Sequence, residues 1–307
     1  MATILCLGDS HTRGFYGSDW VSMLQGELGT GATLVRAGVD GQLARNIERR
    51  SARALAGAGA LLCGVVLFCG TNDALACSPD WRLFHERRTG HVLPGEDVSV
   101  DSFERDVRRI LALVAATRFA SAAAAAEGAA AAAPSSSSPP MPVALVTLPP
   151  LDEHDFADGP RNAVVRDLNA RLAKIAADER GNGVTLVDLF SVLEQEARRS
   201  PPPPRRPGAP PPPAHTPGAM VRGGMLALAR RWLLRQPWDR VAAAGGGRLL
   251  TDRVHLSDRA GRALCGALVP WARRAAPAAT AAAALGGGGG GAGLRGGGKG
   301  QLLGGSA

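Results

Sequence analysis

The chain has 307 residues, of which 45% are hydrophobic and 20% charged, with a formal net charge of +8. This is the composition of a globular protein and excludes a wholly disordered chain, and the glycines lack the period of three that a collagen needs. Because the arginines are scattered and not clustered on one segment, we expect no nucleic-acid partner.

Short apolar runs alternate with amphipathic patterns along the chain. We expect strands at 3–7, 33–35, 65–69, 143–148 and 184–187. We expect helices at 18–28, near 43–55, and at 103–113, 164–176 and 260–269. Near-continuous apolar strands separated by helices predict an α/β fold with a central parallel sheet that is covered on both faces. In such a sheet the functional loops follow the carboxyl ends of the strands.

Three stretches of low complexity do not look able to build a core: 120–140 (Ala, Ser, Pro), 200–213 (Pro, Arg) and 275–307 (Gly, Ala). We therefore expect one domain over 1–274, interrupted by insertions at 120–140 and 200–213, and a disordered tail at 275–307. The alanine run of the first stretch would also suit a continuation of the preceding helix. The proline-rich stretch predicts an extended linker, with an SH3-type partner as the alternative.

The cysteines and the N-terminus bear on the compartment. The five cysteines are odd in number, lie mostly in apolar runs and form no CxxC pair. They indicate buried thiols in a reducing compartment. No charged segment precedes the first strand, so we expect no signal peptide and a cytoplasmic protein. The apolar run 54–70 is too short for a membrane span and predicts a helix end, a turn and a buried strand.

Three short polar groups occupy the positions where parallel strands would bring them together. Gly8-Asp9-Ser10 follows the first strand, and Gly70-Thr71-Asn72-Asp73 follows the third. Asp252-Arg253-Val254-His255 precedes the last helix. We expect all three groups to meet at one edge of the sheet.

The residue types in these groups fit nucleophilic catalysis. A serine hydroxyl needs a base, and a histidine base needs a carboxylate that fixes its tautomer; Ser10, His255 and Asp252 could supply these roles. Asp252 stands three residues before His255 and can reach the imidazole across a single turn. The N–H of Ser10, a glycine N–H and the Asn72 amide could face a developing oxyanion.

Each residue also has a structural interpretation. Ser10 could cap a helix, Asn72 and Asp73 could form a plain turn, and His255 could be a surface histidine before a helix capped by Ser257. Only the presence of the whole set favours catalysis over these. We expect Asp9 and Asp73 to fix loop backbone.

Two further groups invite interpretations that we do not favour. His11 adjoins Ser10, but an adjacent ring rarely points at its neighbour's hydroxyl, so His255 is the expected base. Asp152-Glu153-His154-Asp155 suggests a metal site. One histidine among adjacent, usually solvated acids is weak evidence for that. We expect no metal and no cofactor, and a substrate contact for this loop is the alternative.

The blocks together resemble those of the SGNH (GDSL-type) hydrolases. Gly8-Asp9-Ser10-His11-Thr12-Arg13-Gly14 is similar to the nucleophile block, Gly38-Val39-Asp40-Gly41 to the oxyanion-glycine block, Gly70-Thr71-Asn72-Asp73 to the G-x-N-D block, and Asp252-Arg253-Val254-His255 to the D-x-x-H block. The resemblance runs from residue 3 to about residue 270. It implies a flavodoxin-like three-layer α/β/α sandwich, with Ser10 as nucleophile and Ser10, Gly41 and Asn72 as oxyanion donors.

Some residues depart from the pattern of that family. Arg36 stands where many relatives have asparagine, Arg253 replaces a common glycine, and Ala260-Gly261 replaces a glycine–aromatic pair. None of these changes removes a catalytic group. No G-x-S-x-G motif is present, which argues against the α/β-hydrolase fold.

The resemblance implies a serine ester hydrolase that works through an acyl-enzyme on a small-molecule or lipid ester, and we expect a short acyl chain. Acyl transfer by the same triad is one alternative, and a non-catalytic binding or scaffold protein on the same fold is another. The polar and aromatic segment 77–102 reads as a long loop, either a lid or a surface insertion.

Overall fold

A computed structural model describes residues 2–59, 61–128, 140–199 without 152, 154, 155, 157 and 158, and 216–276. The stretch 200–213 and nearly all of 275–307 lie outside these residues, as does much of 120–140. The expectations of a linker with an SH3-type partner and of a disordered tail fall on these parts of the chain.

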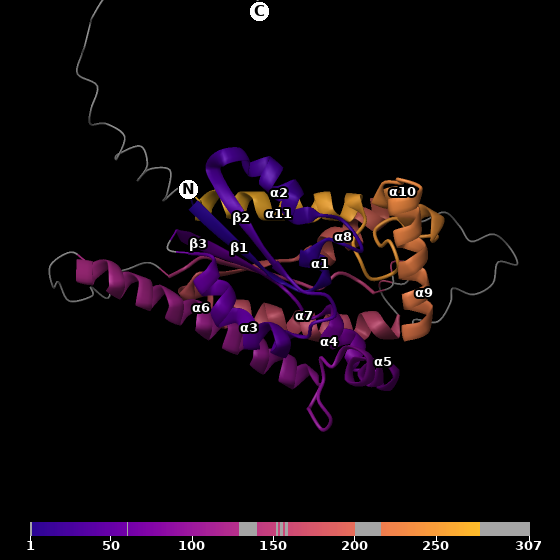
Figure 1. The fold of residues 1–307 in the computed structure, drawn as a ribbon, viewed down its shortest axis with the longest axis horizontal. Coiled ribbons are helices and arrows are strands. Elements are labelled where there is room, and N and C mark those ends of the chain that lie inside the picture. Colours follow the sequence, from indigo (N-terminus) through magenta and orange to yellow (C-terminus); the bar gives the residue numbers. More distant parts are fainter. Residues whose placement is uncertain are drawn as a thin grey trace, which may run out of the picture.

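Five parallel strands form the central sheet in the order β2-β1-β3-β4-β5 (Figure 1). They are β1 (Ala2–Gly8), β2 (Ala32–Gly38), β3 (Leu62–Phe68), β4 (Val143–Val146) and β5 (Val184–Val187). Each corresponds to one of the strands predicted from an apolar run. The parallel sheet follows from these runs, because a strand that is apolar on both sides must be buried on both faces.

The helices that cover the sheet include all those expected from the sequence. The α-helices are α1 (Ser10–Arg13), α2 (Trp20–Leu28), α3 (Ala44–Gly57), α4 (Thr71–Ala76), α5 (Pro79–Phe84), α6 (Val100–Gly128), α7 (Pro160–Asp178), α8 (Leu189–Arg199), α9 (Pro217–Leu228), α10 (Trp238–Ala244) and α11 (Asp258–Ala275). Shorter turns are η1 (Gly29–Gly31), η2 (His85–Thr89), η3 (Arg180–Asn182) and η4 (Ala229–Leu233). The expected helices correspond to α2, α3, α6, α7 and α11.

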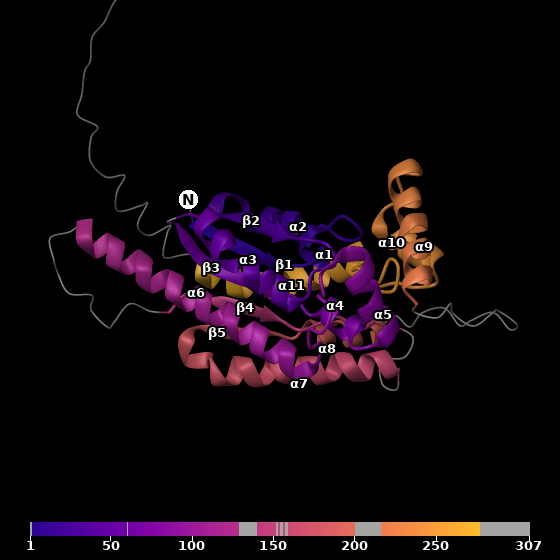
Figure 2. The same cartoon turned by 60° about the horizontal axis from the view of Figure 1, so that its bottom comes forward.

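Alternate side chains of each strand pack into two separate cores. In β1, Leu5 and Leu7 join the core beneath α3, α6 and α7. Ile4 and Cys6 point to the other face and join the core beneath α2, α8 and α11. Figure 2 shows the sheet between these two helix layers. The protein therefore has the three-layer α/β/α sandwich that the sequence predicted.

The segment 77–102 is more structured than the expected loop. It begins with α5, which has Pro79 at its first position and Asp80 in its first turn, and continues into η2. Proline suits the first helical position, where its missing N–H costs nothing, and an acid there favours the helix dipole. The prediction of a loop throughout this segment was wrong in that respect. In the other ambiguous stretch, α6 does continue into the alanine run, as far as Gly128.

Strand β1 lies where the chain reverses its direction of travel across the sheet. The chain first crosses from β1 to β2 and then returns to β3 on the other side of β1. Gly8 pairs with Gly38 in β2 and with Phe68 in β3, so these strands end at the same level. Such a switch point at the carboxyl ends of strands is where open α/β sheets bind ligands.

None of the helices in the described ranges is long and apolar enough to cross a bilayer.

The packing of α11 should contribute strongly to stability. Leu268 is 0% exposed, whereas Leu61 before β3 is 59% exposed. We expect Leu268→Ala to lower the free energy of unfolding by about 2–5 kcal/mol, because it leaves a cavity. Leu61→Ala, the same chemical change, should alter it by less than about 0.5 kcal/mol. Urea denaturation of both variants would check this, and equal effects would contradict the packing described.

Candidate active site

Ser10 stands at the turn between β1 and α1. Asp9 precedes it, and its Oδ1 accepts a hydrogen bond from the N–H of His11 at 3.0 Å, which caps the short helix. Ser10 is the first residue of α1, where backbone N–H groups have no acceptor within the helix. The turn thus places Ser10 directly after β1, at the N-terminus of α1. Asp9 has the loop-fixing position expected of it.

His255 and Asp252 complete a chain of hydrogen bonds with Ser10. The Ser10 hydroxyl lies 2.9 Å from His255 Nε2. His255 Nδ1 lies 2.8 Å from Asp252 Oδ2. An ionised carboxylate only accepts, so Nδ1 carries the proton and Nε2 is left to accept from the serine. Asp252 Oδ1 also accepts from the N–H of His255 at 2.9 Å, so the carboxylate reaches back across one turn as expected.

The segment that carries Asp252 and His255 is closed into a hairpin. Leu250 and Leu256 form an antiparallel bridge, and the Thr251 N–H donates to the His255 carbonyl at 2.8 Å. At its tip Arg253 has a φ of 74°. That left-handed conformation is disfavoured for a residue with a Cβ and is the one that glycine adopts readily.

Glu153, on the loop after β4, holds the first strand of this hairpin. Its two carboxylate oxygens accept from the N–H groups of Arg248 at 2.7 Å and Leu249 at 2.6 Å. The side chain is buried. Sequence reasoning considered Glu153 only as part of a metal or substrate loop and missed this contact, because it joins segments almost a hundred residues apart.

The segment 16–18 holds the hairpin from the other side. The Tyr16 ring stacks on the His255 ring at 5.3 Å between centroids. The Ser18 N–H donates to the Leu256 carbonyl at 2.7 Å. A Cβ on Gly17 would lie 2.6 Å from that same carbonyl oxygen, so only glycine allows this approach. Tyr16 was also missed, and its being the chain's single tyrosine was the only available signal.

Asn72 and Gly41 belong to the segments that follow β3 and β2. Asn72 Nδ2 donates to the Gln42 carbonyl at 3.0 Å and lies 3.4 Å from Asp9 Oδ2. It therefore joins the loop after β1 to the loop after β2. Gly41 has a φ of 71°, which the absence of a Cβ permits. The structure thus brings together the segments of all five residues expected in the site.

Asp73 has the structural role that the sequence suggested. Its carboxylate accepts from the N–H of Ala44, the first residue of α3, at 3.0 Å. Burial raises the pKa of Asp73 to about 7 and that of Asp9 to about 7. Carboxylic groups with such values are poorly suited to act as fixed negative charges near neutral pH.

Asp252 has the opposite electrostatic character. Burial alone would raise the pKa of Asp252, but the charge and hydrogen bonds of His255 outweigh burial and lower it. Burial likewise disfavours charged His255, and the Asp252 carboxylate outweighs that effect and raises the pKa of His255. Asp252 therefore stabilises the imidazolium that forms when His255 takes a proton.

His11 does not contact the Ser10 hydroxyl through its ring. The ring is stacked on Phe68 at 5.0 Å and lies 5.4 Å from the His255 ring. Burial, followed by repulsion from His255, lowers the pKa of His11 to about 3, so it is neutral near pH 7. The preference for His255 over His11 as the partner of Ser10 agrees with this geometry.

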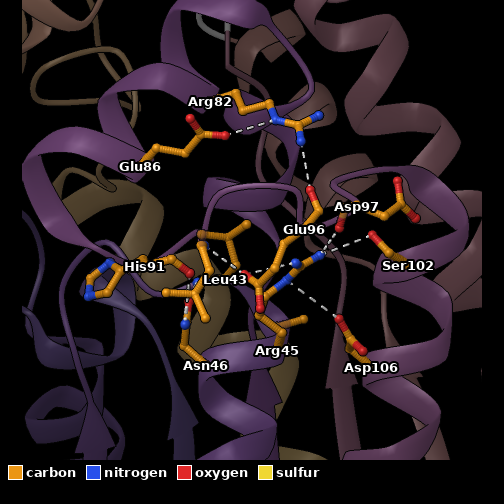
Figure 3. A network of polar contacts seen from close by, with 12 residues as sticks. Leu43, Arg45, Asn46, Arg82, Glu86, His91, Glu96, Asp97, Ser102 and Asp106 are labelled. Atoms are coloured by element: carbon orange, nitrogen blue, oxygen red, sulfur yellow. Dashed lines mark hydrogen bonds and ion pairs between the residues drawn. The ribbon is translucent and has the colours of Figure 1, made fainter.

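A polar network attaches the segment after η2 to the helices beneath it (Figure 3). Arg45 of α3 is buried and donates to the Asp97 carbonyl and, at 3.3 Å, to Ser102 Oγ. Its guanidinium also forms ion pairs with Glu96 at 3.2 Å and Asp106 at 3.9 Å. This part of the segment is therefore anchored to α3 and α6.

His91 connects this anchored segment to the loop after β2. Its Nδ1 lies 2.8 Å from the Gly41 carbonyl, and the Asn46 side chain donates to the His91 carbonyl at 2.9 Å. A Cβ on Gly41 would approach the His91 ring to 3.1 Å. The His91 ring thus packs directly against Gly41. Nothing in the sequence indicated this contact.

The metal interpretation of 152–155 finds no second element to support it. Within the described ranges, no group of three or more His, Cys, Asp or Glu side chains could hold a metal ion. Glu153 is engaged by backbone N–H groups, and the other three residues lie outside those ranges.

Comparisons with known proteins agree with the fold and the blocks. The profile of the GDSL-like lipase/acylhydrolase family matches residues 6–263. A G-D-S-L family lipolytic protein from Veillonella parvula DSM 2008 has a TM-score of 0.51 and 15% identity, with 88% of this chain and 97% of that chain covered. Axe2, an acetylxylan esterase from Geobacillus stearothermophilus, has a TM-score of 0.51 and 16% identity, with 88% and 93% covered. None of the curated proteins matches the chain.

The fold and the profile match define the class of the protein. The chain belongs to the GDSL-like lipase/acylhydrolase family. This family places it among the carboxylic ester hydrolases.

The Glu153 contact gives a prediction for the hairpin. In Glu153→Gln, the amide NH₂ would face one of the two backbone N–H groups, leaving that donor without an acceptor. We expect the free energy of unfolding to fall by about 1–3 kcal/mol. Glu194→Gln, which removes an exposed ion pair with Arg198, should change it by less than about 0.5 kcal/mol. Thermal or urea unfolding checks this, and an unchanged Glu153→Gln variant would contradict the role of Glu153.

Proposed function

We propose that this protein is a serine esterase in which Ser10 attacks a carboxylic ester and forms an acyl-enzyme. The observation that carries the proposal is the continuous line of hydrogen bonds from Ser10 through His255 to Asp252, at 2.9 and 2.8 Å. A serine next to a neutral, oriented imidazole is the arrangement that activates a hydroxyl as a nucleophile.

The proton transfers follow from the tautomer. His255 Nε2 takes the Ser10 proton as the oxygen attacks the acyl carbon, and the Asp252 carboxylate stabilises the imidazolium that forms. The tetrahedral intermediate collapses, and Nε2 gives its proton to the departing alcohol. Water then attacks the acyl carbon while Nε2 takes one of its protons. The second tetrahedral intermediate breaks the bond to Ser10 Oγ, which takes the proton back from Nε2, and the acid leaves. The reaction needs no cofactor.

The proposed oxyanion donors are the N–H groups of Ser10 and Gly41 and the Asn72 amide. As the protein stands, Asn72 Nδ2 has a good acceptor in the Gln42 carbonyl and a long contact of 3.4 Å to Asp9. The Asn72 N–H that points to Asp9 is the one that would donate a hydrogen bond to the oxyanion. Loss of one such donor typically costs about 3–4 kcal/mol of transition-state stabilisation.

We further propose that the acyl group is short. Ser10 is only 7% exposed, and the His91 ring contacts the Gly41 carbonyl. Both features leave little room around the nucleophile. Two fold neighbours are by name acetylxylan esterases: Axe2, and AlAXEase with a TM-score of 0.50. Acyl transfer to an alcohol other than water would use the same residues, and product analysis distinguishes it from hydrolysis. A binding or scaffold role would leave the aligned triad without a purpose.

The nucleophile can be tested with p-nitrophenyl acetate, butyrate and octanoate. We expect wild-type turnover that is fastest on acetate, and in Ser10→Ala a loss of about 10³-fold or more, with folding retained. Ser22→Ala, an exposed serine on α2, is the matched control and should keep its activity. Equal rates in wild type and Ser10→Ala would overturn the assignment, and a preference for octanoate would overturn the short acyl chain only.

The pair Asp252–His255 predicts the pH dependence. His255 accepts a proton only when neutral, so activity should rise as the pH increases through its pKa, which Asp252 raises. Asp252→Asn removes the negative charge, lowers that pKa and should move the rise in activity to lower pH. The turnover number should also fall by about 10³–10⁴-fold, because the imidazole loses its fixed tautomer. A pH–rate profile of the variant that coincides with the wild type would show that Asp252 does not orient His255.

A further inference from the structure

The helix α9 and the turn η4 that continues it present large apolar side chains to solvent. Met225 is 67% exposed and Leu233 is 80% exposed. The exposed apolar residues of this segment, which we call the α9 patch, are Val221, Met225, Leu226, Trp232, Leu233 and Leu234. A run of exposed apolar residues this dense marks an interaction surface more often than a scatter of single residues does.

Five arginines belong to the same part of the chain as the α9 patch: Arg222, Arg230, Arg231, Arg235 and Arg240. Arg222, Arg235 and Arg240 are exposed, and Arg231 interacts electrostatically with Asp258. Asp239, an acid of the same segment, is turned towards α11, where it pairs with Arg262 at 2.7 Å. No carboxylate of the described ranges forms an ion pair with any of those five arginines. The stretch 200–215, which precedes α9 in the sequence, contains no acidic residue.

The α9 patch lies at the end of the molecule that carries the candidate active site. Figures 1 and 2 both place α9 and α10 beyond the carboxyl ends of the strands, at the end where α1 begins. The Trp232 ring is stacked on Phe15 at 6.0 Å. Phe15 adjoins Tyr16, whose ring is stacked on His255. A row of aromatic rings therefore leads from the patch to the proposed base.

We propose that the α9 patch docks on the surface of an anionic lipid bilayer. Apolar and aromatic side chains flanked by arginines are the composition of helices that lie in the interface of such a membrane, where the apolar groups enter the headgroup boundary and the arginines meet lipid phosphates. Trp232, with the Arg231 guanidinium 5.7 Å from its ring centroid, has the amphipathic character typical of that depth. In this arrangement the protein lies on the bilayer without crossing it, and the candidate active site faces the lipid surface.

The charge decides against a second copy as the occupant. A symmetric dimer through this patch would bring the arginines of both copies together without intervening acids, and like charges at an interface disfavour association. The tail 277–307 carries Arg295 and Lys299, so it would add positive charge. An anionic surface outside the chain satisfies both the apolar and the charged parts of the patch.

The test measures sedimentation with vesicles, using Ser10→Ala protein so that no lipid is hydrolysed. Vesicles of phosphatidylcholine with phosphatidylserine should bind the protein, and vesicles of phosphatidylcholine alone should bind it at least about tenfold more weakly. Raising the salt concentration should release it. Absence of binding to the anionic vesicles would overturn the proposal and point to another occupant, such as an acidic protein surface.

Two pairs of variants separate the patch from general stickiness. Met225→Asp with Leu233→Asp should weaken vesicle binding at least about tenfold, whereas Leu61→Asp, at an exposed leucine before β3, should not. Arg222→Gln with Arg235→Gln should weaken binding to anionic vesicles about tenfold, whereas Arg273→Gln with Arg274→Gln at the far end of α11 should not. Equal effects within either pair would overturn the proposal.

Two further measurements complete the test. Sedimentation velocity should show a monomer, and a dimer that Met225→Asp with Leu233→Asp dissociates would assign the patch to a second copy and overturn the proposal. The patch variants, with Ser10 restored, should hydrolyse soluble p-nitrophenyl acetate like the wild type. Loss of that activity would mean that the substitutions disturb the fold and that the lost vesicle binding does not support the proposal. Failure of the proposed esterase function itself would show in Ser10→Ala and leave vesicle binding unchanged.

Discussion

The site depends on one hydrogen bond that joins the two ends of the folded chain. Ser10 and His255 are 245 residues apart in sequence, yet their side chains meet at 2.9 Å. A bond of this length tolerates little error, so both partners must be fixed before they meet. The serine is fixed by the turn after β1, and the histidine by a hairpin that is held from several sides. The rest of the structure can be understood as the means of bringing these two rigid segments together.

Several of the contacts that fix the hairpin involve backbone groups. The side chains of this region therefore give little sign of them in the sequence. The hairpin of His255 is closed by Thr251, held by the carboxylate of Glu153 and pressed against the segment at Ser18. Helix α11, which starts directly after the hairpin, packs on α2, which follows the serine turn. The same helical packing that covers one face of the sheet thus also brings the proposed base to the nucleophile.

Charge is distributed unevenly among the buried acids near Ser10. Asp252 receives an imidazole and backbone N–H groups, and its pKa is lowered. Asp9 and Asp73 fix loops, receive less compensation for burial and have pKa values raised to about 7. His11 stays neutral against Phe68. The Asp252–His255 pair is therefore the part of this cluster in which ionisation is favoured, and it is the pair that touches Ser10.

The sequence by itself determined the class of fold and the members of the candidate site. Continuous apolar strands can only be buried on both faces, and the polar blocks stand directly after β1, β2 and β3 or before α11. Only the tertiary structure decided the supports, such as Glu153, Tyr16 and His91, because each joins segments that are remote in sequence. It also decided the short helices α5, α9 and α10, which lack a long periodic pattern. Helix α9 buries Ala227 against Trp238 and Val241 of α10, and it leaves Val221, Met225 and Leu226 exposed.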